Sequence, residues 1–105
     1  MTDHLGDEDL AEVFKALANP TRLAILRWLR DPESFPPQDQ PAGEVGVCVK
    51  HIQARAQISQ STASQFMAVL QRADLVTSRR VGHWTHYRRN EARLAEFARQ
   101  ITTDI

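Results

Sequence analysis

The stretch from Ile58 to Arg72, ISQSTASQFMAVLQR, predicts a helix with two contrasting faces. At roughly 100° per residue, its apolar side chains gather on one side and its polar side chains on the other. Ser59 precedes the helix and is suited to cap it, because its hydroxyl can accept a hydrogen bond from a free amide of the first turn. The apolar side consists of Ala63, Phe66, Met67 and Leu70. The polar side consists of Gln60, Ser61, Ser64, Gln65, Ala68, Gln71 and Arg72.

The polar face of this helix contains no acidic residue. Its serines and glutamines can both donate and accept hydrogen bonds, and none of them repels a phosphate group as a carboxylate would. The face is therefore compatible with the groove of a DNA duplex. The alternative is an ordinary amphipathic helix whose polar side chains are only solvated. The segments on either side of the helix favour the first interpretation.

These flanking segments predict a helix-turn-helix followed by a basic hairpin. Apolar residues recur at helical spacing from Val49 to Ala56, and the link to the next helix is so short that the two helices should cross steeply. Downstream, residues 75–89 form two runs rich in valine, threonine and aromatic residues around Gly82. A glycine there can take the positive φ of a hairpin turn. We expect the helix-turn-helix at about 49–72 and the hairpin at about 75–89.

The rest of the chain predicts further helices, all within a single domain of residues 1–105. We expect an acidic first helix at about 7–18 and a last helix, capped by Asn90, at about 90–103. Asn19 and Pro20 suit the N-cap and first position of another helix. The buried stripe predicted for that helix is Leu23, Leu26 and Leu29.

The segment at about 31–46 is rich in proline and contains two glycines. We predict a loop here, because the segment has too much proline for a helix and is too polar for the core. It is either a tolerated surface loop or the border of a site for an inducer or a partner. Its sequence favours neither interpretation.

The charge of the chain is divided along its length, although 13 basic and 13 acidic residues give a formal net charge of zero. Acidic residues outnumber basic ones before Val49, and the balance reverses from Lys50 to Arg93. Such a division is expected when one face of a protein meets a polyanion and another does not. A neutral net charge therefore does not argue against DNA binding.

The composition indicates a cytoplasmic protein with no membrane segment. No apolar run approaches the roughly 20 residues of a membrane span, and the acidic N-terminus does not resemble a secretory signal. The single cysteine excludes an internal disulfide. Ser59, Ser61 and Ser64 lack a matching arrangement of histidine and aspartate, and the sequence has no glycine-rich phosphate loop. We therefore expect no enzymatic activity.

Three segments, FKALANPTRLAILRWL, SQSTASQFMAVLQRADLV and SRRVGHWTHYRR, together resemble the ArsR family of bacterial winged-helix repressors. The resemblance extends from about Val13 to Ile101. It implies a winged helix-turn-helix fold, mainly α with a small β-hairpin wing, dimerising through the first and last helices. It also implies that the partner is double-stranded DNA with dyad symmetry. The implied interface of the homodimer is Leu10, Val13, Phe14, Leu94, Phe97 and Ile101.

The same resemblance implies that a recognition helix enters the major groove and that the wing lies over the flanking backbone. We expect Gln60, Ser61 and Gln65 to contact bases or lie near them. Arg79 and Arg80 are expected to contact phosphate or the minor groove. The full set of DNA-contacting residues implied in this way is Gln60, Ser61, Thr62, Ser64, Gln65, Arg79, Arg80, His83 and Trp84.

Several residues in or beside this set also have structural interpretations. Thr62 lies at the edge between the two faces of its helix. Arg88 is expected to stabilise the hairpin or the last helix, and Trp84 belongs to a residue type that packs more often than it stacks on DNA. His83 and His86 lie three residues apart, so in a strand they would point to opposite faces. We expect both histidines at the surface or near DNA.

The sequence says least about the signal that controls such a repressor. Many relatives hold a metal with a Cys-Val-Cys motif at the start of the helix before the recognition helix, whereas this chain has Cys48, Val49 and Lys50 there. The ammonium of Lys50 would repel a cation, so we expect no metal and no cofactor. The alternative is a metal site of Cys48 and His51 with an outside ligand such as His4.

Cys48 has two further interpretations. A lone cysteine is most often a buried small hydrophobic residue. As a redox sensor, it would form a disulfide between protomers or with a small thiol. We therefore expect a metal-free repressor with an unidentified small-molecule inducer or none, and a metal- or thiol-responsive repressor is the alternative. The competing class is a winged helix that docks on proteins and does not bind DNA.

Overall fold

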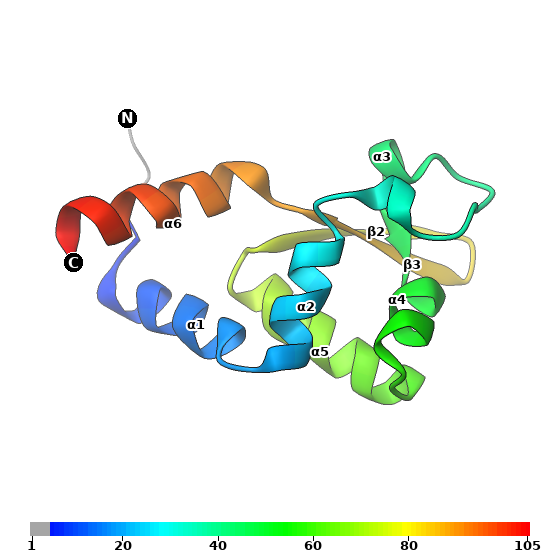
Figure 1. Cartoon of the computed structure of the whole chain (residues 1–105), viewed down its shortest axis with the longest axis horizontal. Coiled ribbons are helices and arrows are strands. Elements are labelled where there is room, and N and C mark those ends of the chain that lie inside the picture. The colour runs from blue at the N-terminus through cyan, green and yellow to red at the C-terminus, as the bar shows by residue number, and fades with distance from the viewer. Residues whose placement is uncertain (1–4) are drawn as a thin grey trace.

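The structure, a computed structural model, describes residues 5–105 and combines helices with a small antiparallel sheet (Figure 1). The helices are α1 (Asp7–Leu17), α2 (Pro20–Trp28), α3 (Ala42–Val45), α4 (Val49–Ala56), α5 (Gln60–Arg72) and α6 (Glu91–Asp104), and a 3-10 turn, η1, spans Pro32–Ser34. The strands are β1 (Val47–Cys48), β2 (Val76–Val81) and β3 (Trp84–Arg89). None of the helices described in residues 5–105 is long and apolar enough to cross a membrane.

Three helices begin at polar residues whose side chains cap the first turn. The side chain of Asn19 accepts a hydrogen bond from the amide of Arg22 at 2.9 Å, and Pro20 is the first residue of α2. Ser59 Oγ accepts from the amide of Thr62 at 3.0 Å at the start of α5. At the start of α6, Asn90 Oδ1 accepts from the amide of Arg93 at 3.2 Å. The three predicted N-caps are therefore confirmed.

The sheet has the strand order β1-β3-β2, with both pairs antiparallel. Strands β2 and β3 form the predicted hairpin, and Gly82 in its turn has φ 62°. Strand β1 was not expected, and it pairs Val47 with Tyr87 and Cys48 with His86. Because side chains alternate along a strand, Val47 and Tyr87 face the core while Cys48 and His86 lie on the outer face of the sheet.

The core lies where α1, α2, α4 and α5 meet the inner face of the sheet. Ile25, Ile52, Met67 and Leu70 have no exposed surface there. Val13 is also completely buried, so it belongs to the protomer's own core, which corrects its expected place in a dimer interface. A second correction concerns α2, where Leu26 and Leu29 are buried as predicted but Leu23 is 38% exposed.

The segment 31–46 is more structured than its composition predicts. It contains η1 and the short helix α3, and Phe35 and Val45 are both buried. The guanidinium of Arg55 on α4 lies 4.6 Å from the ring centroid of Trp28 and 4.9 Å from that of Phe35. These contacts attach the loop to α2 and α4, so tertiary packing overrides the local proline-rich composition.

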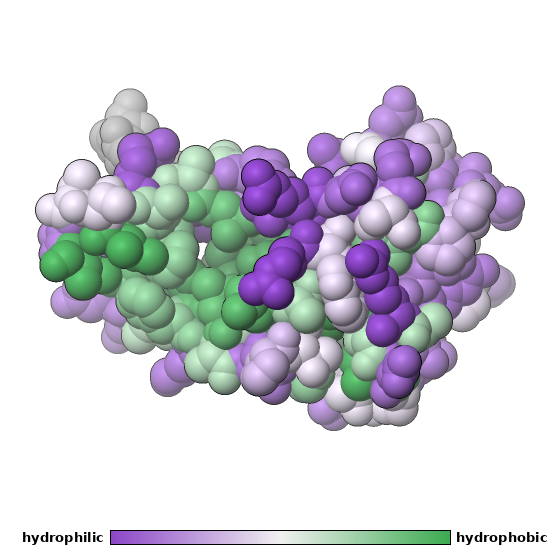
Figure 2. Space-filling view, in the orientation of Figure 1, coloured by the Kyte–Doolittle hydropathy of each residue, from purple (hydrophilic) through white to green (hydrophobic). Residues whose placement is uncertain are grey.

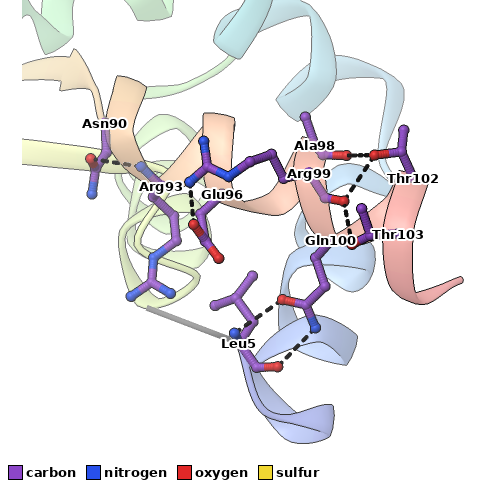
Figure 3. A network of polar contacts seen from close by, with 9 residues as sticks. All are labelled: Leu5, Asn90, Arg93, Glu96, Ala98, Arg99, Gln100, Thr102 and Thr103. Atoms are coloured by element: carbon purple, nitrogen blue, oxygen red, sulfur yellow. Dashed lines mark hydrogen bonds and ion pairs between the residues drawn. The ribbon is translucent and has the colours of Figure 1, made fainter. Parts of the chain in front are cut away.

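Helix α6 is attached to the start of the described chain by a polar clamp. Gln100 Oε1 accepts a hydrogen bond from the amide of Leu5 at 3.0 Å, and Gln100 Nε2 donates to the carbonyl of Leu5 at 2.9 Å (Figure 3). Both residues are buried. Helices α1 and α6 lie together at one end of the longest molecular axis, which measures 41 Å (Figure 1). The turn of the hairpin and the start of α5 lie toward the other end.

Candidate nucleic-acid interface

The first half of α5 presents an exposed polar surface. Gln60, Ser61, Ser64 and Gln65 are all exposed, as expected for residues that contact DNA. Thr62 is half-buried, and its hydroxyl lies 2.9 Å from that of Ser59 in a hydrogen bond beside the helix cap. Thr62 therefore belongs to the capping structure, in agreement with its position at the edge between the two helix faces.

The second half of the polar face is occupied by contacts within the protein. Gln71 Nε2 donates to Ser78 Oγ at 3.0 Å, which links α5 to β2. Arg72 lies 4.0 Å from the carboxylate of Glu12 on α1. Gln71 and Arg72 remain exposed, but the N-terminal half of α5 is the part of the polar face that makes no contact with another element among residues 5–105, a distinction that helical periodicity could not make.

The hairpin carries the other predicted contacts. Arg79 is exposed, and its guanidinium makes no hydrogen bond or ion pair with residues 5–105. Arg80 is also exposed and donates from Nε to the carbonyl of Gly82 at 3.3 Å. His83 is exposed in the turn. Trp84 is 37% exposed, and the ammonium of Lys50 lies 5.3 Å from its ring centroid.

Most other arginines in the basic half of the chain have partners inside the protein. Arg88 donates to the carbonyl of Glu44 at 2.9 Å, so it contacts α3, whereas the sequence predicted that it stabilises the hairpin or the last helix. Arg89 pairs with Glu91 at 2.9 Å, and Arg93 pairs with Asp74 at 2.7 Å. These contacts use both acidic residues of the basic half and leave Arg79 and Arg80 as the hairpin arginines that make no hydrogen bond or ion pair outside the hairpin among residues 5–105. The structure thus distinguishes arginines that are held by other elements from arginines that are not, which a count of charges in the sequence cannot do.

The candidate metal ligands do not form a cluster. Cys48 is 2% exposed, and residues 5–105 contain no group of three or more His, Cys, Asp or Glu side chains that could hold a metal ion. His4, the suggested outside ligand, lies outside the described residues. Burial lowers the pKa of His51 below its usual 6.5, and the charges of Lys50 and His86 lower it further.

His86 differs most from its predicted position. It was expected at the surface or near DNA, but it is only 6% exposed because the 38–40 loop and Lys50 cover the outer face of the sheet around it. Its Nδ1 is buried and has no hydrogen-bond partner among the described residues. Sequence reasoning missed this residue because strand β1, which pairs Cys48 with it, was not predicted.

Helices α1 and α6 carry an apolar surface at the opposite end from the hairpin turn. Figure 2 shows hydrophobic side chains gathered over these helices, while the other half of this face is mostly hydrophilic. Phe14 is 46% exposed and Ile101 is 36% exposed, whereas Leu10 and Leu94 are half-buried. Phe97 is buried and meets Phe14 edge to face, with 5.4 Å between ring centroids. The sequence reasoning missed one exposed apolar residue near this surface, Ile105.

Known proteins resemble this chain over most of its length. It is 41% identical over 96 residues to the uncharacterised HTH-type transcriptional regulator YbzH of Bacillus subtilis, which covers 90% of this chain and 96% of the relative. It is 34% identical over 80 residues to a protein of Halobacterium salinarum provisionally named arsenical resistance operon repressor ArsR2, covering 76% of this chain and 58% of the relative. No protein-family model matches the chain.

Solved structures resemble the fold as well. An ArsR-like transcriptional regulator from Rhodococcus sp. RHA1 superimposes with a TM-score of 0.68 at 28% identity, covering 90% of this chain and 77% of the other. The homodimeric winged helix-turn-helix DNA-binding domain of Mb0332 from Mycobacterium bovis gives a TM-score of 0.64 at 28% identity, covering 98% of this chain and 91% of the other. The winged helix-turn-helix fold expected from the sequence is therefore confirmed.

Proposed function

The chain belongs to the ArsR family of winged helix-turn-helix transcriptional regulators, and we propose that it acts as a homodimeric repressor on a dyad-symmetric DNA operator. The observation that carries this proposal is the acid-free, exposed N-terminal half of α5 in the same half of the molecule as the unpaired arginine of the hairpin. The relatives are transcriptional regulators, and we assign no catalytic activity to this chain. A repressor acts where the chromosome lies, so we propose that it works in the cytoplasm.

In this proposal, the first two turns of α5 read the major groove. Gln60, Ser61, Ser64 and Gln65 offer both donors and acceptors, which are the groups that distinguish base pairs there. Thr62 supports the helix start, and we propose that it contacts the DNA backbone beside it. The N-terminus of α5 adds its own attraction for phosphate through the helix dipole.

The hairpin supplies the electrostatic part of the interface. Arg79 and Arg80 are exposed and free of acidic partners among residues 5–105, so they can neutralise phosphates without first breaking an ion pair. His83 in the turn extends this surface. Trp84 is already stacked against Lys50, and we propose that it contacts DNA only with its exposed edge.

The dimer is proposed to form through the apolar surface of α1 and α6. Leu10, Phe14, Leu94 and Ile101 provide the surface, and Phe97 supports Phe14 from beneath. A two-fold axis through these helices would place the two hairpins far apart on either side. The operator would then contain two half-sites related by the same axis.

The deciding experiment is selection of bound sequences from a pool of random duplex DNA at low salt. The proposal expects an enriched palindrome, and a Gln65→Ala variant should change the preference among operator variants more than it lowers overall affinity. Equal losses on every operator variant would show that Gln65 positions the helix without reading bases. Absence of any enriched sequence would contradict DNA recognition and favour a winged helix that docks on proteins. Repeating the selection with metal salts, chelator, oxidant and reductant identifies the class of inducer.

A further inference from the structure

The outer face of the sheet contains a thiol and an imidazole that no proposed DNA contact uses. Cys48 and His86 are paired across β1 and β3, and residues paired in this way have Cβ atoms about 4.5–5.5 Å apart on the same face. They are 2% and 6% exposed. The Nδ1 atom of His86 is fully buried and lacks a hydrogen-bond partner among residues 5–105. A buried polar atom without a partner is unfavourable, so a hydrogen-bond donor created beside it would be stabilised.

A small cavity of about 120 Å³ connects the two side chains with the surface. Residues 38–40 and Lys50 form its walls together with Trp84. One water molecule takes up about 30 Å³ in the liquid, so the cavity has room for a molecule of a few heavy atoms. A peroxide fits this space.

The lining of the cavity favours chemistry at sulfur over capture of a metal ion. The lining carries one ammonium, that of Lys50, and one carboxylate, that of Asp39, and the described residues offer no group of three ligands. We propose that Cys48 is a modification site at which a small hydroperoxide oxidises the thiol to a sulfenic acid, with His86 Nδ1 as the hydrogen-bond partner of the new S–OH group. The oxidation of Cys48 does not depend on the proposed function, whereas its effect on DNA binding rests on that function.

The reaction needs no second cysteine. The sulfur of Cys48 attacks one oxygen of the hydroperoxide, so an S–O bond forms while the O–O bond breaks. Sulfur loses two electrons and the peroxide gains them. The thiol proton passes to the departing oxygen, which leaves as an alcohol, or as water when the oxidant is hydrogen peroxide. A small thiol can later attack the sulfenic sulfur and release water, and a second thiol then restores Cys48.

The position of Cys48 couples this oxidation to the proposed DNA interface. Its amide donates to Gln38 Oε1 at 3.0 Å, and Gln38 Nε2 donates to the carbonyls of Gln40 and Gly46, so the loop is held over the cavity. Cys48 also directly precedes α4, the first helix of the helix-turn-helix. An S–OH group that hydrogen-bonds to His86 Nδ1 changes the contacts of His86, and Arg79 is paired with His86 across β2 and β3. Oxidation should therefore weaken operator binding.

The first test measures the modification without DNA. The reduced full-length chain is treated with hydrogen peroxide, and intact mass spectrometry follows the gain of one oxygen and its trapping by dimedone, which reacts with sulfenic acids. We expect one trappable oxygen on Cys48 and none on a Cys48→Ser variant. In a His86→Phe variant the sulfenic acid should overoxidise faster to the two-oxygen product, whereas His83→Phe, at the exposed histidine of the same hairpin, should behave as the wild type. A Cys48 that does not react with peroxide in the folded protein overturns the proposal. If His86→Phe and the wild type overoxidise at the same rate, His86 does not stabilise the sulfenic acid.

The second test measures operator binding by fluorescence anisotropy before and after oxidation. We expect affinity to fall by about tenfold or more in the wild type, to recover with reductant and to stay constant in Cys48→Ser. Unchanged affinity of the oxidised wild type overturns the regulatory coupling. If the reduced protein binds no DNA, the proposed function fails, and the mass measurement still judges the modification independently.

Discussion

At the residue scale, Gly46 and Gly82 share a positive φ but have different surroundings. Both have a positive φ, 104° and 62°, which is unfavourable for residues with a side chain. A Cβ on Gly46 would lie 2.7 Å from backbone atoms of Tyr87, whereas a Cβ on Gly82 would meet nothing within 4 Å. The close approach of Gly46 to β3 is what allows β1 to join the sheet.

This difference predicts unequal costs for the same substitution. Gly82→Ala should lower the free energy of unfolding by about 1 kcal/mol, the cost of a positive φ alone. Gly46→Ala should cost roughly 2–4 kcal/mol because the backbone of β3 must also move. Urea denaturation of both variants measures the difference. Equal destabilisation would show that β1 does not depend on the close contact with Tyr87.

The lowered pKa of His51 predicts how the free energy of unfolding changes with pH. Its pKa in the folded protein lies below the usual 6.5 because of burial and the charges of Lys50 and His86. The unfolded chain therefore binds a proton more readily, so this residue makes the folded state less stable as the pH falls through about 6.5. His51→Gln should reduce the loss of unfolding free energy between about pH 7 and pH 5. Lys50→Gln should reduce this loss less, because burial lowers the pKa of His51 more than the charge of Lys50 does. Urea denaturation at several pH values is the measurement, and a pH profile in His51→Gln identical to that of the wild type contradicts the prediction.

At the element scale, the cap of α5 combines a structural and a functional role at one position. Ser59→Ala removes the hydrogen bond to the amide of Thr62 and should destabilise the protein by about 1 kcal/mol. Ser59→Asp keeps a capping acceptor and should retain stability, but it adds a negative charge at the proposed DNA surface. Thermal unfolding and operator affinity measured on both variants separate the roles. If Ser59→Asp binds the operator as tightly as the wild type, the start of α5 does not lie against DNA in the complex.

The hairpin makes a prediction about salt. Replacing Arg79 and Arg80 together with alanine should weaken binding about equally across DNA sequences and reduce the slope of log K against log salt by roughly two. Arg27→Ala, at an exposed arginine on α2, serves as the control and should leave the slope unchanged. The measurement is a salt titration of operator affinity. An unchanged slope in the double variant would exclude the hairpin from the interface.

The elements also differ in how far the sequence could predict them. Asn19, Ser59 and Asn90 act on the amide three residues ahead, so their capping role depends only on local sequence and could be predicted. Strand β1 has two residues and exists because β3 lies beside it, which no local pattern reports. Likewise, the packing of Phe35 depends on Arg55, which lies on a different element.

At the scale of the whole molecule, periodicity predicts which residues share a face but not what covers that face. The polar side of α5 was correctly identified, yet Gln71 and Arg72 turn out to contact other elements of the same protomer. The apolar side of α1 was also identified, but Val13 packs into the core while Phe14 remains exposed. The assignment of surface residues to DNA or to a second protomer stays a proposal that rests on exposure and charge.

On the face shown in Figure 2, a mostly hydrophilic half and a more hydrophobic half lie toward opposite ends of the longest axis. This division predicts the effect of a charge placed on α6. By the helical repeat, Leu94, Ala98 and Ile101 form one stripe, and Gln100 lies on the neighbouring side that clamps Leu5. A charge at Ile101 therefore falls on the proposed dimer surface without touching the clamp.

Ile101→Glu should convert the dimer into a monomer, because burying an unpaired carboxylate in an apolar interface is strongly unfavourable. Sedimentation velocity measures the association, and operator binding should weaken in parallel, since a monomer engages only one half-site. Ala92→Glu is the matched control, because Ala92 is exposed on the same helix but lies on the side away from the stripe. Phe14→Glu tests the surface from α1, with circular dichroism to confirm folding because Phe14 also contacts Phe97. If Ile101→Glu and the wild type sediment alike as dimers, the protomers associate through another surface. If the variant is monomeric yet binds the full operator with wild-type affinity, the two-fold arrangement is not needed for recognition.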